Sequence, residues 1–187
     1  MKIQIGVMGS ASGEYDEGVQ HKCFELGQAI ARRGAVLVTG ACPGYPFMAT
    51  MGCKSEGGLT VGISPGINRQ EHETRYESPV TGFDVIIYTG MGFMGRESII
   101  IRSCDFVIIV GGRSGTLGEF AIAYDEGRLI GVVEGTGGIA DQLREIEDDV
   151  RKPWTAGVLY DEDPVRLLDR LIEAHNLAVA SVAKPKG

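Results

Sequence analysis

The chain has 187 residues, of which 43% are hydrophobic and 23% charged, and its formal net charge is −7 at pH 7. A chain of this length buries roughly 70% of the surface that its unfolded form exposes, so it needs no disulfide or metal to hold a core. The acidic balance argues against nucleic acid and anionic membranes as partners and favours small molecules or proteins.

Short apolar, β-branched runs alternate with stretches of helical period along the chain. The expected strands are Ile3 to Met8, Ala35 to Thr39, Thr60 to Ile63, Asp84 to Tyr88, Phe106 to Val110, Leu129 to Val133 and Gly157 to Tyr160. Because these runs are apolar throughout rather than alternating, we expect strands that are buried on both faces. The pattern predicts an α/β fold with a doubly wound, mainly parallel sheet of about seven strands and helices on both faces.

Two helices have clear boundaries in the sequence. Apolar residues at helical spacing from Val19 to Ile30 predict the first helix, and Gly34 marks its end. Asp163 as a cap, followed by Pro164 at the first helical position, predicts where the last helix begins.

The chain shows no internal repeat, linker or low-complexity tract, so we expect one domain over residues 1–176. Beyond about Asn176 the last helix is expected to fray into a flexible tail over residues 177–187. The stretch from Ser64 to Gly82 is long, polar and without clear period, and such loops inside compact domains are often functional lids.

Glycine-rich segments follow several of the predicted strands, at residues 9–13, 40–44, 90–95 and 111–116. In an open parallel sheet these turns meet at one edge, where helix N-termini face an anion. Taken together, the four glycine-rich segments predict a nucleotide or phosphate site. The residues expected to contact the ligand are Gly9, Ser10, Gly40, Gly92, Gly95, Gly112, Arg113, Ser114, Gly115 and Thr116.

Three familiar site patterns can be set aside. Gly90 to Gly95 reads G-x-G-x-x-G, but no acidic residue follows at the end of the next strand to bind a ribose diol, so an NAD site is not expected. The 111–119 segment lacks the lysine of a triphosphate-binding loop, which favours a monophosphate. Gly62 to Gly66 reads G-x-S-x-G, but Pro65 has no N–H for an oxyanion hole, which argues against a serine hydrolase.

Glu119 and Arg96 are the candidate catalytic residues, and each has a structural alternative. Thr116 and Glu119 stand in the T-x-x-E relation of a capping box, so Glu119 either caps a helix or acts on the sugar attached to a bound phosphate. Arg96 opens a helix, where a cation opposes the macrodipole and calls for a compensating anion. That anion is either the ligand's phosphate or an acid such as Glu97.

Other features bear on ligands and compartment. Tyr45, His72, Arg75 and Tyr76 are candidate walls for a base or sugar, or ordinary loop surface. The four cysteines lack C-x-x-C spacing and the three histidines lie far apart, so we expect no metal site. With no membrane-length apolar run and no signal pattern, the protein is expected in the cytoplasm.

Gly9-Ser10, the helix-opening Arg96 and Gly-x-x-Gly-Thr-x-x-Glu at 112–119 resemble the LOG family, once labelled lysine decarboxylases, over about residues 3–175. The resemblance implies a Rossmann-like homodimer that hydrolyses the N-glycosidic bond of nucleoside 5′-monophosphates to free base and ribose 5-phosphate, without a metal or cofactor. We expect the 112–116 loop to hold the phosphate, Arg96 to neutralise it or orient the ribose, and Glu119 to support attack by water.

The sequence departs from the family pattern in the loop and beside the arginine. Gly111, Gly112 and Arg113 replace the family's Pro, Gly and Gly; Glu97 replaces a lysine, and Gly118 replaces an acid. A decarboxylase is not expected, because no lysine falls at a strand end or glycine turn to bind pyridoxal phosphate. The related molybdenum cofactor carrier proteins, which bind a phosphorylated pterin without turnover, are the alternative; a scaffold protein is the third.

Overall fold

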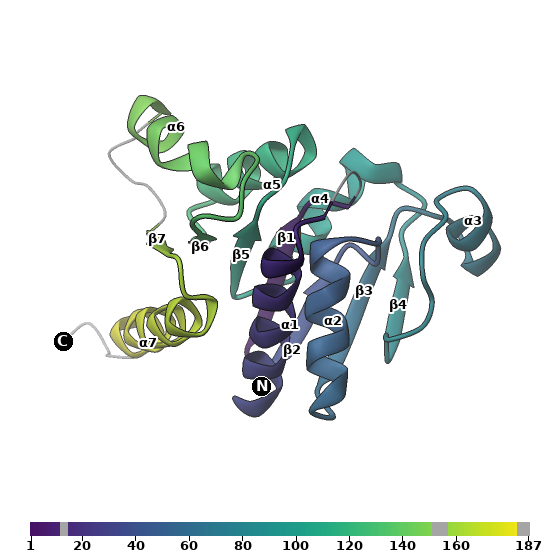
Figure 1. Cartoon of the computed structure of the whole chain (residues 1–187), viewed down its shortest axis with the longest axis horizontal. Helices are drawn as coiled ribbons and strands as arrows, with labels where there is room; N and C mark the ends of the chain where they lie inside the picture. Colours follow the sequence, from purple (N-terminus) through teal and green to yellow (C-terminus); the bar gives the residue numbers. More distant parts are fainter. Residues whose placement is uncertain (12–14, 151–156, 183–187) are drawn as a thin grey trace.

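The computed structural model describes residues 1–11, 15–150 and 157–182. In these residues the sheet is entirely parallel, with seven strands in the order β4-β3-β2-β1-β5-β6-β7 (Figure 1). The strands are β1 (Gln4–Gly9), β2 (Val36–Thr39), β3 (Leu59–Ser64), β4 (Val85–Tyr88), β5 (Phe106–Val110), β6 (Leu129–Val133) and β7 (Val158–Asp161). The chain builds outward from β1 to β4 and returns to the other side of β1 with β5. The predicted doubly wound α/β fold is therefore confirmed.

Helices cover both faces of the sheet (Figure 1). They are α1 (Glu17–Arg32), α2 (Tyr45–Ser55), α3 (Arg69–Thr74), α4 (Gly92–Arg102), α5 (Ser114–Asp125), the short 3-10 helix η1 (Ala140–Gln142), α6 (Leu143–Val150) and α7 (Pro164–Val182). Ile5 and Val7 of β1 pack into one apolar cluster with α1, α2 and α7, while Met8 joins a second cluster with α4 and α5. Successive strand residues point to opposite faces, so the central strands are buried on both sides, as predicted.

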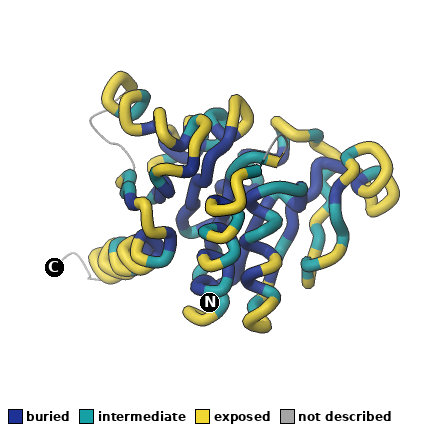
Figure 2. The backbone as a smooth tube through the Cα atoms, viewed as in Figure 1, coloured by how far each residue is buried: buried dark blue, intermediate teal, exposed yellow. Residues whose placement is uncertain are grey.

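The edge strand β4 does not fit that expectation. Val85 is 49% exposed and Ile87 is 48% exposed, whereas every residue of β5 is buried (Figure 2). β4 lies at the end of the sheet and pairs only with β3. An apolar sequence shows that a strand can be buried but not whether the fold provides a neighbour to cover it.

The stretch from Ser64 to Gly82 is more ordered than predicted, because it contains helix α3. Asn68 caps this helix by accepting a hydrogen bond from the Glu71 N–H at 2.9 Å. His72 is fully buried, with Nδ1 2.8 Å from Ser64 Oγ and Nε2 3.0 Å from the Pro79 carbonyl oxygen. These contacts attach the helix to the end of β3.

Helix α7 begins where the sequence predicts but ends later than predicted. Asp163 caps α7 as predicted, because its carboxylate accepts hydrogen bonds from the N–H groups of Val165 at 2.9 Å and Arg166 at 3.0 Å. The helix then continues to Val182, past the point where the sequence predicts fraying. Residues 183–187 of the predicted tail, and residues 12 and 13 of the first glycine segment, lie outside the described residues.

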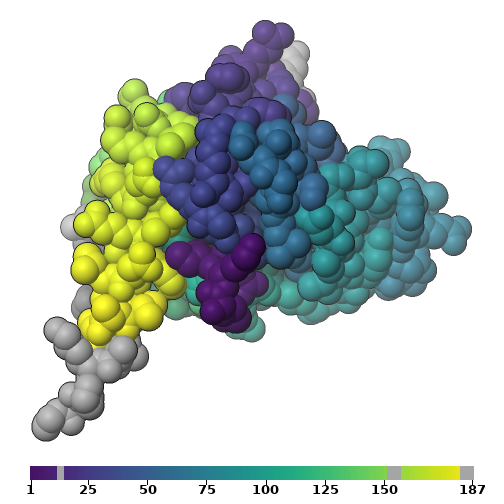
Figure 3. All heavy atoms as spheres, turned by 90° about the horizontal axis from the view of Figure 1, so that it is seen from below, coloured from purple at the N-terminus to yellow at the C-terminus, as the bar shows by residue number. Residues whose placement is uncertain are grey.

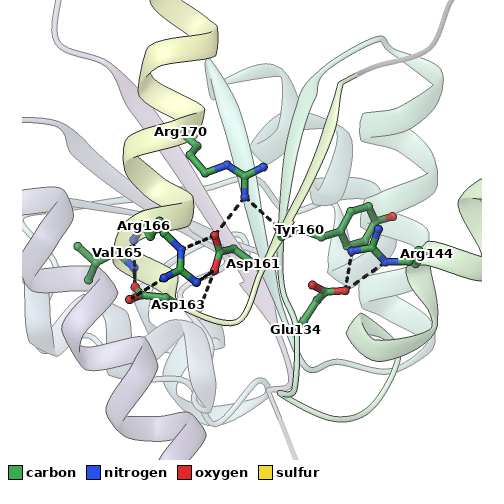
Figure 4. Close-up of polar contacts among 8 residues, drawn as sticks. All are labelled: Glu134, Arg144, Tyr160, Asp161, Asp163, Val165, Arg166 and Arg170. Atoms are coloured by element: carbon green, nitrogen blue, oxygen red, sulfur yellow. Dashed lines mark hydrogen bonds and ion pairs between the residues drawn. The ribbon is translucent and has the colours of Figure 1, made fainter.

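Helix α7 is held against the body of the fold by charged contacts. It lies alongside α1 (Figure 3), where Arg33 Nε is 2.5 Å from Asp169 Oδ1. At its start, the carboxylate of Asp161 accepts hydrogen bonds from Arg166 Nη2 at 2.5 Å and Arg170 Nη1 at 3.1 Å (Figure 4). The side chain of Asp161 is 7% exposed, so its carboxylate is largely shielded from solvent although both arginines are exposed.

The Asp161→Asn variant should therefore lose stability in a pH-dependent way. The hydrogen bonds from Arg166 hold the pKa of Asp161 well below its ordinary value of 3.8. A depressed folded-state pKa stabilises the native state above the unfolded value, and that stabilisation is lost as the pH falls. We expect a deficit of about 1–2 kcal/mol at pH 5–7, given two exposed arginines, that shrinks below about pH 4.

Urea unfolding at pH 7, 5 and 3 measures this deficit, with Glu162→Gln as the matched control. Glu162 is the exposed neighbour of Asp161 and its loss should leave stability unchanged. An equal deficit for Asp161→Asn at all three pH values would contradict the charged pairing as its cause.

Candidate functional site

A pocket of about 330 Å³ opens where β1, β2 and β5 end, beside the first turns of α4 and α5. In a doubly wound sheet this is the switch point between β1 and β5, where the two halves diverge and leave a crevice. The predicted residues Gly9, Ser10, Arg96, Arg113, Ser114, Gly115, Thr116 and Glu119 all line it. Gly40, Gly92, Gly95 and Gly112, also predicted to contact a ligand, do not line it but lie in the segments around it.

Gly9 brings the two central strands together at the pocket. It pairs with Val110, the last residue of β5. A Cβ atom at Gly9 would lie 2.3 Å from the Val110 carbonyl oxygen, so no larger residue fits without moving the backbone. The glycine thus allows the segments after β1 and β5 to face each other across the crevice.

The start of α5 presents unpaired amide groups to the pocket. Gly112 turns the chain with a φ of +99°, and Arg113, in an extended conformation, occupies the cap position without a side-chain cap. The first amide to bond back is that of Leu117, which donates to the Arg113 carbonyl at 2.9 Å. Within the described residues, the N–H groups of Ser114, Gly115 and Thr116 have no acceptor. They are backbone donors at the positive end of the helix dipole, where an anion would be stabilised.

This start also excludes the capping box. Because the helix begins at Ser114, Thr116 lies in the first turn rather than at the cap, and Glu119 lies further inside the helix. No described residue donates a hydrogen bond to the Glu119 carboxyl group. The capping explanation of Glu119 is therefore wrong, and the carboxyl group is left facing the pocket.

Arg96 does not open a helix as predicted, because α4 begins at Gly92 and Arg96 lies in its second turn. Its buried guanidinium donates hydrogen bonds to the carbonyl oxygens of Gly40 and of Ile63, the latter at 2.8 Å, and Nη2 lies 3.1 Å from Cys42 Sγ. It forms no ion pair with Glu97 or with any other described acid. Nε alone remains buried without a partner. Arg96 thus clamps the ends of β2 and β3 at one wall of the pocket.

Gly40 leaves the space that this clamp needs. A Cβ atom at Gly40 would lie 2.7 Å from Arg96 Nη2. The other two glycines have local roles at the start of α4. The Gly92 amide donates to the Pro65 carbonyl at 3.1 Å, and a Cβ atom at Gly95 would meet the Met91 side chain at 2.9 Å.

Two carboxyl groups from neighbouring helices share the pocket. Glu97 of α4 is 6% exposed, and its Oε2 has no hydrogen-bond partner among the described residues. Glu119 of α5 lines the same pocket and is half-buried. Burial and the nearby Glu97 charge raise the pKa of Glu119 from 4.5 to about 8, while burial also raises the pKa of Glu97. The pair therefore holds a proton at neutral pH.

The pocket contains residues that sequence reasoning did not select. Phe93 and Met94 lie at its mouth and are 51% and 70% exposed, and Cys42 contributes to the wall beside Arg96. Phe93 and Met94 occupy the variable positions between the glycines of the 90–95 segment. Both residues lie in the first turn of α4, and two large apolar side chains among these glycines were the signal from which the sequence could have indicated them.

The candidate walls for a base lie elsewhere. Tyr45 is buried against Tyr15, His72 of α3 is buried against the end of β3, and Arg75 pairs with Glu71 at 2.6 Å. Tyr76 packs edge-on against Phe93, with ring centroids 5.0 Å apart, and so supports the mouth indirectly. Among the described residues, no helix is long and apolar enough to cross a membrane, and no cluster of three acidic, histidine or cysteine ligands could hold a metal.

Comparisons with known proteins place this geometry in context. An uncharacterized protein from Archaeoglobus fulgidus is 39% identical over 129 residues, which is 68% of this chain and 78% of that protein. The molybdenum cofactor binding protein from Rippkaea orientalis is 29% identical with a TM-score of 0.75, covering 93% of this chain and 97% of its own. The Moco carrier protein from Chlamydomonas reinhardtii is 27% identical with a TM-score of 0.75, covering 93% and 99%.

The model of the SLOG cluster4 family matches residues 2–168, which is nearly the whole of the described fold. This match confirms the LOG-like resemblance inferred from Gly9-Ser10, Arg96 and the 112–119 loop. The solved relatives agree with the Rossmann-like topology. The chain belongs to the SLOG cluster4 family.

Proposed function

We propose that the protein hydrolyses the N-glycosidic bond of nucleoside 5′-monophosphates, releasing the free base and ribose 5-phosphate. The observation that carries the proposal is a half-buried carboxyl group, Glu119, whose pKa is raised to about 8 and which lines the same pocket as the unpaired amides of α5. Carboxyl groups with strongly shifted pKa values in clefts are characteristic of acid–base chemistry. The free helix N-terminus supplies a complementary site for the phosphate.

The spacing along α5 suits this substrate. The amides of Ser114 to Thr116 would bind the 5′-phosphate, and Arg113 stands beside them in the pocket wall. Glu119 follows Ser114 by five residues, a rise of about 7.5 Å along the helix axis. That separation is on the scale of the ribose between a 5′-phosphate and its glycosidic bond. Phe93 and Met94 at the mouth offer apolar surface for the flat face of a base.

The protonation state changes the role expected of Glu119. With a pKa of about 8, the carboxyl group is mostly protonated at pH 7 and cannot take a proton from water. It can instead donate a proton to the departing base nitrogen, which stabilises the leaving group as the sugar becomes cationic. The reaction needs no metal or cofactor, since water is the nucleophile and the acid comes from the chain. We place this activity in a cytoplasmic homodimer.

The proposal is tested by chromatographic detection of free base from a panel of nucleoside 5′-monophosphates, with the matching nucleosides as controls. We expect release from at least one monophosphate, much slower release from its nucleoside because the α5 amides then have no phosphate to bind, and no loss on adding EDTA. No base from any member would contradict the proposed hydrolysis.

A second candidate is a non-catalytic carrier of a phosphorylated cofactor such as the molybdenum cofactor. It is favoured by the relatives from Rippkaea orientalis and Chlamydomonas reinhardtii, which are described by molybdenum cofactor binding and carriage. It is also favoured by Arg96, whose Nη atoms are engaged by the backbone rather than directed at a substrate. A carrier would show a ligand-induced rise in Tm with no base released from any nucleotide.

A further inference from the structure

Two departures from the family pattern, one on α4 and one on α5, lie next to each other in the structure. Glu97 stands where the resemblance places a lysine, and Gly118 stands where it places an acid. In the structure these two positions meet: a Cβ atom at Gly118 would lie 3.3 Å from Glu97 Oε2. The carboxylate lost from α5 is thus replaced in space by one that reaches over from α4.

Glu97 differs from an ordinary acidic residue on a helix surface because its carboxyl group is buried and one of its oxygens has no hydrogen-bond partner in the part of the chain that the structure describes. Its side chain is nine-tenths buried and lines the pocket, yet Oε2 has no hydrogen-bond donor among the described residues. A buried carboxylate left unsatisfied by the protein is costly and calls for a partner that enters the pocket. Water or a ligand hydroxyl group is the partner that would satisfy it.

Burial raises the pKa of Glu97 and the charge of Arg96 opposes that rise, but Glu97 forms no ion pair among the described residues. The titratable and charged groups that line the same pocket are Arg96 from α4, Glu119 from α5, Arg113 before α5 and Cys42 after β2. Arg96 directs its Nη atoms to the carbonyl oxygens of β2 and β3, and neither arginine forms an ion pair with Glu97 within the described chain. Glu97 and Glu119 lie in the same crevice, so ionisation of one carboxyl group disfavours ionisation of the other.

We propose that Glu97 is the second catalytic carboxylate, paired with Glu119 across the pocket, and that it takes the proton from the attacking water. This role rests on the proposed function. The water oxygen forms a bond to the anomeric carbon and its proton goes to Glu97. The carbon–nitrogen bond breaks, the electron pair stays on the base nitrogen, and that nitrogen receives the proton of Glu119. Transfer between the two carboxyl groups then restores the starting state.

The first test is the pH dependence of kcat in Glu97→Gln. Wild-type kcat should rise as Glu97 loses its proton and fall as Glu119 loses its own near pH 8. In Glu97→Gln we expect kcat to fall about 100-fold or more with KM within about threefold, because water loses its base. The rising limb should disappear and the falling limb should move to lower pH, since the like charge beside Glu119 is gone.

Gly118→Ala provides a second variant that leaves the carboxyl group in place but displaces it. The added Cβ crowds Glu97 Oε2, so kcat should fall about tenfold or more. Alanine is the better helix former, so Tm should be at or above that of the wild type. Glu145→Gln, at an exposed position of α6, is the matched control and should match the wild type in kcat, KM and pH profile.

The outcomes separate the two proposals. A wild-type enzyme that releases base while Glu97→Gln keeps the same kcat and pH profile would overturn the role of Glu97 and leave the proposed function standing. A wild-type protein that releases no base from any monophosphate would overturn both. Lost activity in Gly118→Ala together with a lowered Tm would also count against the pairing, because it would indicate general damage to the helix.

Discussion

Glu119→Gln should lower kcat for release of free base by about 10²- to 10⁴-fold while KM changes little. Glutamine fits the same space and still offers a donor, but it cannot transfer a proton to the departing nitrogen. The amides at the start of α5, which we propose bind the phosphate, are untouched by the change, so ground-state binding should persist. Steady-state kinetics on the best nucleotide of the panel measure both constants.

The direction in which kcat and Tm change with pH tests the protonation state of Glu119 and also controls for folding. Wild-type kcat should fall about tenfold per unit above pH 8, where Glu119 becomes ionised, and Glu119→Gln should lack this limb. A carboxyl group whose folded-state pKa is raised from 4.5 to about 8 makes the wild type progressively less stable over that interval as the pH rises. Glu119→Gln should therefore have a higher Tm than the wild type at pH 8.

The opposite combination would contradict the assignment. A Glu119→Gln variant that keeps wild-type kcat, or one that loses activity with a lower Tm at pH 8, means that Glu119 is not the acid. Loss of ligand-induced stabilisation with no measurable turnover in the wild type would instead assign Glu119 to binding, as a carrier requires.

The sheet could be predicted from the sequence because its strands are uniform in character. Phe106–Val110 and Leu129–Val133 are strands with the predicted bounds, since five apolar residues between polar turns fit only a strand buried on both faces. The exposure of β4 and the continuation of α7 to Val182 depend on what packs against them. Such neighbours are set by the whole fold and not by local pattern.

The location of the site could be predicted, but its internal contacts could not. Glycine turns after parallel strands converge by topology alone, so Ser10, Ser114 and Glu119 meet at one pocket. The side to which Arg96 turns depends on carbonyl oxygens from residues 40 and 63, and the partnership of Glu97 with Gly118 spans two helices. Contacts between residues this far apart in the sequence leave no periodic pattern from which they could be predicted.

Arg96→Met should destabilise the protein by about 3 kcal/mol, a fall in Tm of about 6–12 °C. Methionine fills part of the space but donates no hydrogen bond. The carbonyl oxygens of Gly40 and Ile63, at the ends of β2 and β3, therefore lose their donor. Arg96→Lys should recover part of the loss, because one ammonium group can reach a carbonyl but cannot replace the planar fork.

The same variants decide whether Arg96 is a clamp or a ligand group. If it clamps β2 and β3, stability and ligand affinity should fall together, because the pocket wall at Cys42 loosens with the clamp. Unfolding in urea and the Tm shift caused by the nucleotide measure the two quantities side by side. An Arg96→Met protein with wild-type stability but no nucleotide binding would show that the guanidinium leaves the backbone and contacts the phosphate directly. That result would confirm the phosphate contact predicted for Arg96 from the sequence.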